Sequence, residues 1–343
     1  MIFLYILALL VCFVFLARIV DLFFISSLDK ISADLRLSHD AAGATLMAVG
    51  SSAPELFVAL FSVFKPGNHQ MIGIGSIVGS AIFNLLVIVG ASALIRTAKL
   101  TWQPVIRDLS FYTVSVGLLV WFIFDGHFTL VEAGAFLAIY VLYVIAVVYW
   151  KKLFPYPERE YTEAPKMDKE KNRALKGFDK VLQTVFPKEK YYYRAFFFSI
   201  FLIAGLSWAL VELAVVISVA LNIPEAIIAL TVLAIGTSIP DLFSSMIVAK
   251  QGRGEMAVSN AIGSNIFDIL VGLGLPMLIF MFIHGSSIDA GGSNLTGSAI
   301  ILFASVILLF LLLIFSKWKI GKPGGFILVG LYIFYVVREI ILM

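Results

Sequence analysis

Apolar runs of membrane-spanning length recur along this chain and constrain its fold more than any other feature. A helix needs about 20 predominantly apolar residues to cross the hydrocarbon core of a bilayer. Ten runs meet that need, at residues 2–25, 41–64, 71–95, 105–124, 128–150, 195–221, 224–249, 256–283, 296–316 and 324–342. With 61% hydrophobic and only 14% charged residues, the chain is not a soluble domain of ordinary composition. The sequence therefore predicts an all-α polytopic membrane protein.

The first run is predicted to be a retained transmembrane helix. It starts at Ile2 without a basic segment before it, and it is too long for the apolar region of a secretory signal. The single cysteine, Cys12, lies inside this run, so no disulfide framework or Cys-x-x-Cys motif is expected. We interpret Cys12 as a small core residue.

Basic residues indicate the orientation, because Lys and Arg accumulate on the cytoplasmic side of membrane proteins. With both termini outside, only Lys65 and Arg338 fall outside, and Arg18 falls within a span. The inside segments then hold twelve basic residues between Lys151 and Arg194, together with Lys30, Arg36, Arg96, Lys99, Arg107, Lys250, Arg253, Lys317, Lys319 and Lys322. We expect a plasma membrane protein with a cytoplasmic loop at 151–194.

That loop divides the chain into a first five-helix unit at 1–150 and a second at 195–343. Because five is odd, the second unit must enter the membrane from the opposite side, so the units are predicted to be inverted repeats. The mixed charge of the loop is typical of a solvated linker rather than a regulatory docking segment. A short surface helix is expected over Lys166 to Lys180.

Two sequence blocks occur once in each unit. Gly50-Ser51-Ser52-Ala53-Pro54-Glu55 matches Gly236-Thr237-Ser238-Ile239-Pro240-Asp241, and Gly79-Ser80-Ala81-Ile82-Phe83-Asn84 matches Gly263-Ser264-Asn265-Ile266-Phe267-Asp268. A carboxylate at the bilayer centre costs roughly 2.5–3.5 kcal/mol, so the duplicated acids indicate a bound cation. We therefore expect broken helices at an ion site shared by the repeats.

The blocks supply oxygen ligands of several kinds. Proline lacks an N–H and clashes with the carbonyl four residues back, so each helix should be weakened there. Backbone carbonyl oxygens would then be free to bind a cation, and those of Ala48 and Ala234 are the expected ligands. Helical spacing places a hydroxyl beside each amide or carboxylate, in the pairs Ser52–Glu55, Ser238–Asp241, Ser80–Asn84 and Ser264–Asp268. All four pairs are predicted to point into one centre.

Such a centre suits hard cations such as calcium and sodium and disfavours zinc and copper. No histidine lies in the blocks, which removes the usual proton shuttle. The four histidines, His39, His69, His127 and His284, are placed near span ends in solvated or interfacial roles. Three carboxylates, Glu55, Asp241 and Asp268, could balance one divalent ion or several monovalent ions in alternation.

Structural readings compete at several positions. A transmembrane proline is often a simple kink, and glycine patterns often serve close helix packing. Asp21 and Glu212 occupy corresponding places in the repeats, and Arg18 is expected to pair with Asp21, so both acids are interpreted as structural or gate-lining charges. Glu132 is interpreted as an interface anchor. The duplication of the acidic blocks is what favours a functional reading for them.

The two blocks resemble the alpha repeats of the sodium/calcium exchanger branch of the cation/calcium antiporter superfamily, G-[ST]-S-x-P-[ED] followed by G-S-x-I-x-[ND]. The resemblance implies that Glu55 and Asp241 carry calcium. It also implies that the motif hydroxyls, Ser51 and Thr237 among them, complete the calcium and sodium sites with Asn84, Asp268 and freed carbonyls, and that thin outer spans slide over the core.

The blocks are similar in particular to those of potassium-dependent sodium/calcium exchangers, in which an Asp at the position of Asp268 accompanies potassium co-transport. Microbial members also have Asp there without requiring potassium, so Asp268 leaves potassium transport open. The linker lacks the long regulatory loop of animal exchangers. The compact chain is therefore similar to a prokaryotic member.

The expected function is alternating-access exchange of sodium for calcium. A calcium/proton antiporter of the same superfamily is the alternative, although the serines and Asn84 favour sodium ligation over protonation. A membrane enzyme would need a nucleophile, metal cluster or phosphate loop, and a passive channel would need pore rings, so neither is predicted. No cofactor and no nucleic-acid partner are expected, and protein partners are left undetermined.

Overall fold

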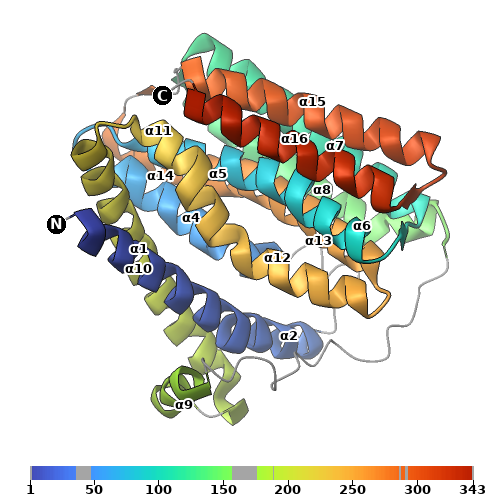
Figure 1. The fold of residues 1–343 in the computed structure, drawn as a ribbon, viewed down its shortest axis with the longest axis horizontal. Coiled ribbons are helices and arrows are strands. Elements are labelled where there is room, and N and C mark those ends of the chain that lie inside the picture. The colour runs from blue at the N-terminus through green and yellow to red at the C-terminus, as the bar shows by residue number, and fades with distance from the viewer. Residues whose placement is uncertain are drawn as a thin grey trace.

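The protein is described by a computed structural model over residues 2–35, 48–156, 176–187, 189–285, 287–289 and 293–341, which are almost entirely helical (Figure 1). The α-helices are α1 Ile2–Ile19, α2 Ile25–Asp34, α4 Ala48–Phe64, α5 Gln70–Phe83, α6 Val89–Ile95, α7 Trp102–Asp125, α8 Leu130–Leu153, α9 Lys176–Val185, α10 Tyr192–Leu221, α11 Glu225–Ile228, α12 Ala234–Lys250, α13 Gly254–Phe267, α14 Gly274–His284, α15 Ser293–Phe315 and α16 Lys322–Ile341. Between them lie the π-helical turns η1 Val20–Phe24, η3 Asn84–Ile88, η5 Ala229–Leu233 and η6 Asp268–Leu273, and the 3₁₀ turn η4 Glu189–Tyr191.

The described residues contain nine helical spans that are long and apolar enough to cross a membrane. A further apolar helix, α4, starts at Ala48, and the first part of its predicted span, 41–47, lies outside the described residues. The other predicted spans agree with the structure to within a few residues, except that the first continues through η1 and α2 to Asp34. The all-α polytopic fold is confirmed.

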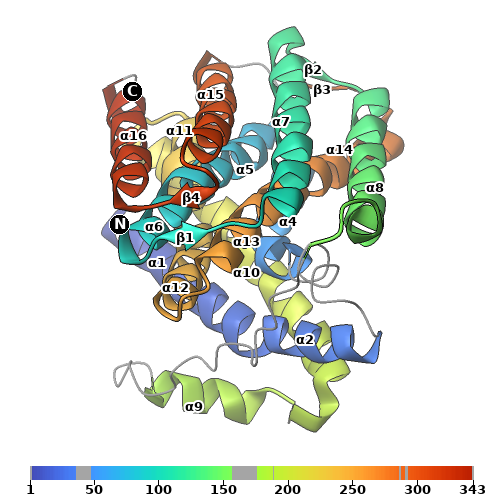
Figure 2. The same cartoon turned by 90° about the vertical axis from the view of Figure 1, so that its right-hand side faces the viewer.

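The helices lie in three groups. Helices α4, α5, α12 and α13 form the centre, where α4 contacts α5 and α13 while α12 contacts the same two helices. On one side α1 and α10 pack against each other and cover α4 and α12, and on the other side lie α7, α8, α15 and α16 (Figures 1 and 2). The central helices are therefore shielded from lipid on both sides.

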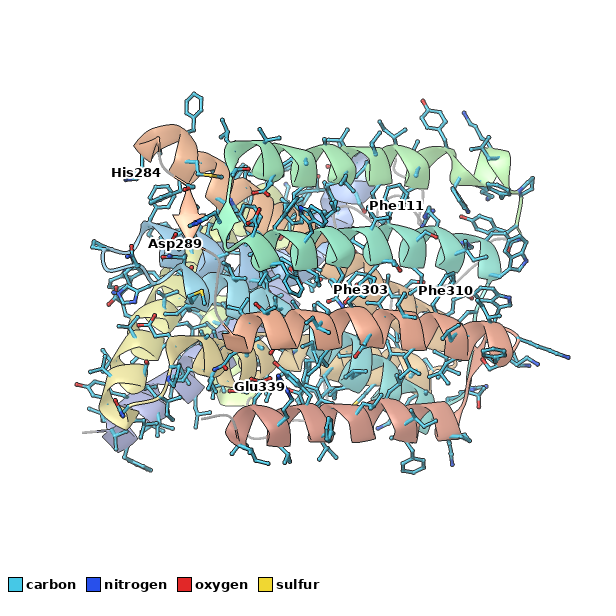
Figure 3. All side chains as sticks on the ribbon, turned by 90° about the horizontal axis from the view of Figure 1, so that it is seen from above. Phe111, His284, Asp289, Phe303, Phe310 and Glu339 are labelled. Atoms are coloured by element: carbon cyan, nitrogen blue, oxygen red, sulfur yellow. The ribbon has the colours of Figure 1, made fainter. Side chains whose placement is uncertain are left out.

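Two short antiparallel ladders connect the two halves of the chain. The first pairs β1 Ala98–Lys99 with β4 Lys319–Ile320, and the second pairs β2 His127–Phe128 with β3 Ile288–Asp289. They lie at opposite ends of α15, and Figure 3 shows Asp289 and His284 at one of these ends. By span order the loop of β1 corresponds to that of β3, and the loop of β2 to that of β4. Exchanging the halves therefore converts one ladder into the other, as inverted repeats require.

The irregular parts of the central helices do not fall at the prolines. Pro54 lies inside α4 and Pro240 inside α12, and both helices continue past them. The predicted break is thereby corrected in position, since irregular geometry occurs instead at η5, directly before Ala234, and at η3 and η6, which start at Asn84 and Asp268. Each helix continues across the one hydrogen bond that its proline cannot make. The π-helical turns are of a kind that recurs at functional sites.

Helix α9 belongs to the linker and packs against α1. Within the predicted helix Lys166–Lys180, the residues 166–175 lie outside the described residues, and α9 continues to Val185. The Phe186 ring stacks on Phe23 at a centroid distance of 3.6 Å. The Arg18 Nε donates to Asp179 Oδ1 at 2.8 Å. The expected ion pair of Arg18 with Asp21 is thus corrected, because α9 brings a carboxylate within direct reach of the guanidinium.

Candidate ion-binding site

Three acids meet where α4, α12 and α13 converge at the centre. Glu55 on α4 is 3% exposed and Asp268, where α13 gives way to η6, is 1% exposed, whereas Asp241 on α12 is half-buried. Asp268 interacts electrostatically with both Glu55 and Asp241. Because like charges in a water-poor interior repel, this arrangement favours a cation between them.

The site acids differ from the other buried carboxylates in having no cationic partner. Asp108 accepts from Arg107 Nε at 2.8 Å, and Glu339 forms an ion pair with Arg338. In the part of the chain that the structure describes, no Lys, Arg or His side chain forms an ion pair with the three site acids. Among the described side chains, the negative charge of the three acids therefore has no paired cation.

Hydroxyl groups cross between the two halves at the site. Ser80 Oγ and Ser238 Oγ are 2.8 Å apart, joining α5 to α12. Ser52 Oγ donates to the carbonyl of Ser264 at 3.5 Å, joining α4 to α13. The Glu55 carboxylate lies beside the hydroxyls of Thr237 and Ser80, and that of Asp268 beside Ser52. Each of these two acids therefore has a hydroxyl neighbour from the other repeat.

Three buried oxygens at the site have no hydrogen-bond partner. They are Glu55 Oε2, Asn84 Oδ1 and Asp268 Oδ1. A buried acceptor left without a partner costs about 1–3 kcal/mol, and more for a charged group, so such atoms are rare in folded proteins. Oxygens of this kind are the ligands that hard cations prefer. These atoms are the strongest structural indication of a cation site.

The site is mixed in its chemistry rather than purely acidic. Among the described residues, no three His, Cys, Asp or Glu side chains gather closely enough to hold a metal by themselves. A cation here would therefore share its coordination between carboxylates and the hydroxyl, amide and carbonyl oxygens around them.

The remaining predicted ligands are buried but bond within their own helices. Ser51 Oγ donates to the carbonyl of Ala48 at 3.4 Å. Thr237 Oγ1 donates to Leu233 at 3.1 Å and to Ala234 at 3.4 Å. The Ala48 and Ala234 carbonyls thus already accept a hydrogen bond from a hydroxyl group. Their role as ion ligands stays a prediction.

Two residues that sequence reasoning passed over lie at the site. Asn265, directly after Ser264, is fully buried and accepts from Asn84 Nδ2 at 2.9 Å. Tyr112 on α7 is also fully buried and contacts Asn265. Asn265 lies inside a duplicated block, and its difference from Ala81 at the matching position is the signal that could have identified it.

The secondary charges lie around the site rather than in it. Lys65 Nζ forms an ion pair with Glu212, and His69 Nδ1 lies 2.8 Å from Glu225 Oε1. Asp21 interacts electrostatically with Asp241. His39 lies outside the described residues, and His127 and His284 are at the ends of their spans, as expected. Glu132 accepts from the backbone of Thr129 and caps α8.

Comparisons with known proteins identify the family of the chain. A family model described as "Sodium/calcium exchanger protein" matches residues 4–149 and 191–341. The human sodium/potassium/calcium exchanger 5 is 30% identical over 94% of this chain and 80% of its own length, and the chicken sodium/potassium/calcium exchanger 2 is 28% identical over 99% and 77%.

Two solved structures share the fold. The sodium-calcium exchanger NCX_Mj superimposes with a TM-score of 0.62 at 25% identity, covering 98% of this chain and 99% of its own. The H⁺/Ca²⁺ exchanger CAX superimposes with a TM-score of 0.74 at 14% identity, covering 99% and 86%. Because the family model matches both helical halves and most of the chain, this protein belongs to the sodium/calcium exchanger protein family.

Proposed function

We propose that the protein is a secondary antiporter that exchanges sodium for calcium across a membrane by alternating access. The transported ions bind among Glu55, Asp241, Asp268 and the oxygens around them. The observation that carries this proposal is the set of buried oxygens without partners on Glu55, Asn84 and Asp268. The family match and the names of the curated relatives support the same two ions.

Exchange follows from the charge of the site. With no cation bound, uncompensated carboxylates lie in a region of low dielectric constant, so the empty protein should not readily change the side to which it opens. One calcium ion or several sodium ions restore neutrality and permit the change. Because both ions use overlapping ligands, the entry of one requires the departure of the other.

Potassium transport is a finer part of the proposal. The curated relatives are named sodium/potassium/calcium exchangers, and Asp268 provides a third carboxylate at the site. A third acid allows one monovalent ion to accompany calcium without leaving excess charge. Uptake assays in which potassium is varied alone test this step.

The orientation is proposed from the distribution of basic residues. Both termini are placed outside the cell membrane and the 151–194 loop in the cytoplasm, because this orientation puts 22 of the 25 Lys and Arg residues inside. Protease access to the linker, or thiol access to a cysteine introduced there, in intact cells compared with permeabilised cells checks the assignment.

Calcium/proton exchange is the alternative, and the structural likeness to CAX favours considering it. The two functions differ in which gradient drives calcium. Calcium-45 uptake into sodium-loaded proteoliposomes, with external sodium, potassium and pH varied independently, separates them. Uptake that requires an outward sodium gradient supports the proposal, whereas uptake driven by a proton gradient alone would replace sodium with protons.

Site variants provide the specific test. We expect Glu55→Ala and Asp241→Ala to abolish uptake while expression stays near that of the wild type, because each removes a charge that the cation must meet. Glu132→Gln is the matched control, since Gln keeps the acceptor that caps α8 far from the site. Normal uptake in both alanine variants would overturn the site assignment.

A further inference from the structure

The amide of Asn265 is held at both ends. Its Nδ2 donates to Tyr112 Oη at 2.9 Å and to the carbonyl of Ala81 at 3.1 Å, while its Oδ1 accepts from Asn84 Nδ2 at 2.9 Å. A backbone carbonyl can only accept a hydrogen bond, so the Ala81 contact determines which end of the Asn265 amide carries nitrogen. The oxygen of Asn265 must then face Asn84.

This arrangement determines the orientation of the Asn84 side chain. Because Asn265 presents an oxygen, Asn84 must turn its nitrogen toward Asn265 and its own oxygen away. That oxygen is one of the three buried site oxygens without a partner. With the amide reversed, Asn84 would present N–H groups to the cation and an oxygen to another oxygen, and both contacts would be repulsive.

We propose that Asn265 is a positioning residue of the transport site. Held by Tyr112 and Ala81, it turns the Asn84 side chain so that its oxygen, and not its nitrogen, faces the transported cation. This inference rests on the cation site proposed above. It extends that site to α7, through Tyr112, and to a residue that need not contact the ion itself.

The two repeats differ in a way that fits this role. Asn84 corresponds to Asp268, and Asn265 corresponds to Ala81. A carboxylate offers equivalent oxygens whichever way it turns, whereas an amide offers an oxygen on one side only. Across the site, the amide Asn84 thus faces Asn265. At the equivalent place in the other repeat, the carboxylate Asp268 is matched with Ala81, which has no polar side chain. One requirement accounts for both differences.

A double-mutant cycle between positions 265 and 84 tests the inference. Calcium-45 binding to purified protein is measured for the wild type, Asn265→Ala, Asn84→Asp and the double variant. We expect Asn265→Ala to raise the half-saturating calcium concentration about tenfold, which corresponds to about 1.4 kcal/mol. In the Asn84→Asp background the same change should leave that concentration unchanged or lower it, because a carboxylate needs no orientation and one of its oxygens would face the Asn265 oxygen.

Further variants separate orientation from packing. Tyr112→Phe removes one of two acceptors of Asn265 and should have an intermediate effect. Thr113→Val is the matched control, because its hydroxyl donates to Leu109 of its own helix.

The possible results have distinct meanings. An equal effect of Asn265→Ala in both backgrounds would assign the residue to packing and overturn the inference, as would unchanged binding in Asn265→Ala. Loss of calcium binding in Asn84→Asp that the added Asn265→Ala does not restore would also contradict it, since the carboxylate then presents an oxygen without facing that of Asn265. If the wild type itself neither binds nor exchanges calcium, the proposed function fails instead.

Discussion

At the scale of single residues, Gly79 allows the two repeats to approach each other beside the site. A Cβ atom at this position would lie 2.3 Å from the carbonyl oxygen of Leu230 and 2.7 Å from the Cβ of Ala234. Ser80, the next residue, bonds to Ser238 of the other repeat. The absence of a side chain at Gly79 thus permits the helix contact that brings these hydroxyls together.

The matching glycine in the second repeat provides a control. A Cβ atom at Gly263 would meet no heavy atom within 4 Å. We expect Gly79→Ala to destabilise the protein by about 1–3 kcal/mol through overpacking. Gly263→Ala should be neutral or stabilising by roughly 0.5–1 kcal/mol, because alanine loses less backbone freedom. Thermal unfolding of the detergent-purified variants checks both, and equal midpoints would contradict the difference.

Residue-level prediction was possible where the duplicated pattern itself carried the chemistry. Glu55, Asp268 and Asn84 could be identified because a carboxylate or amide recurs at matching places in apolar spans. Asn265 could not be assigned a role in the same way, because its partner Tyr112 lies 153 residues away in sequence. The orientation of an amide depends on such distant contacts and has no signature in the sequence alone.

At the scale of elements, the central helices owe their shape to π-helical turns at matching positions. The turn η3 starts at Asn84 and η6 starts at Asp268. A π turn adds a residue to the local helical repeat, so the side chains before and after it no longer share one face. The sequence pointed to the prolines because their chemistry is local, whereas a π turn depends on packing by neighbouring helices. Hydropathy alone placed the described spans to within a few residues, apart from the end of the first.

Helix α9 gives the linker a defined attachment to the outer helix pair. Leu182 is buried in the apolar cluster that includes residues of α1 and α10, and Phe186 contacts the rings of Phe23 in η1 and Phe198 in α10. Arg18 bonds to Asp179 with both side chains largely enclosed. Mixed charge in the linker predicted only a solvated connector. The attachment depends on a few apolar residues, whose effect is not visible in the overall composition of the linker.

A charge exchange tests this attachment. Arg18→Asp and Asp179→Arg should each weaken it by about 1 kcal/mol, because they place like charges together and leave them partly enclosed. That loss corresponds to roughly fivefold faster amide hydrogen exchange in residues 176–187. The double variant should return exchange toward the wild-type rate. Equal exchange in all four proteins would show that the ion pair does not hold α9.

At the scale of the whole molecule, the two repeats have the same elements but unequal packing. Helix α10 packs along α4 more extensively than α1 packs along α12, although these pairs correspond in the repeats. Glu55 is buried, whereas Asp241 is half-buried. Likewise Val58 is fully buried, whereas its counterpart Ser244 is half-buried. Two similar repeats have thus adopted different packing, in which α12 is more exposed around its acid than α4 is.

CAX superimposes better than NCX_Mj although its sequence is less similar, with TM-scores of 0.74 and 0.62 at 14% and 25% identity. The order of the two neighbours by superposition is thus not their order by sequence identity. The duplicated blocks predicted the family and the candidate site residues, and of these the family is confirmed. They carry no information on which half is open, because alternating access requires both states to be compatible with one sequence.

Thiol accessibility tests this asymmetry directly. In a Cys12→Ser background, single cysteines are placed at Ser244 and at Val58, each three residues beyond the acid of its own repeat. We expect the cysteine at 244 to react with a water-soluble maleimide faster than the cysteine at 58, because Ser244 is half-buried whereas Val58 is fully buried. With both termini outside, α12 ends in the cytoplasm, so labelling at 244 should require permeabilised cells. Sodium or calcium conditions that favour the opposite state should reverse the order of the two sites. Equal reaction at both positions under every ionic condition would contradict exchange of open and closed halves, whereas labelling at 244 in intact cells would reverse the proposed orientation.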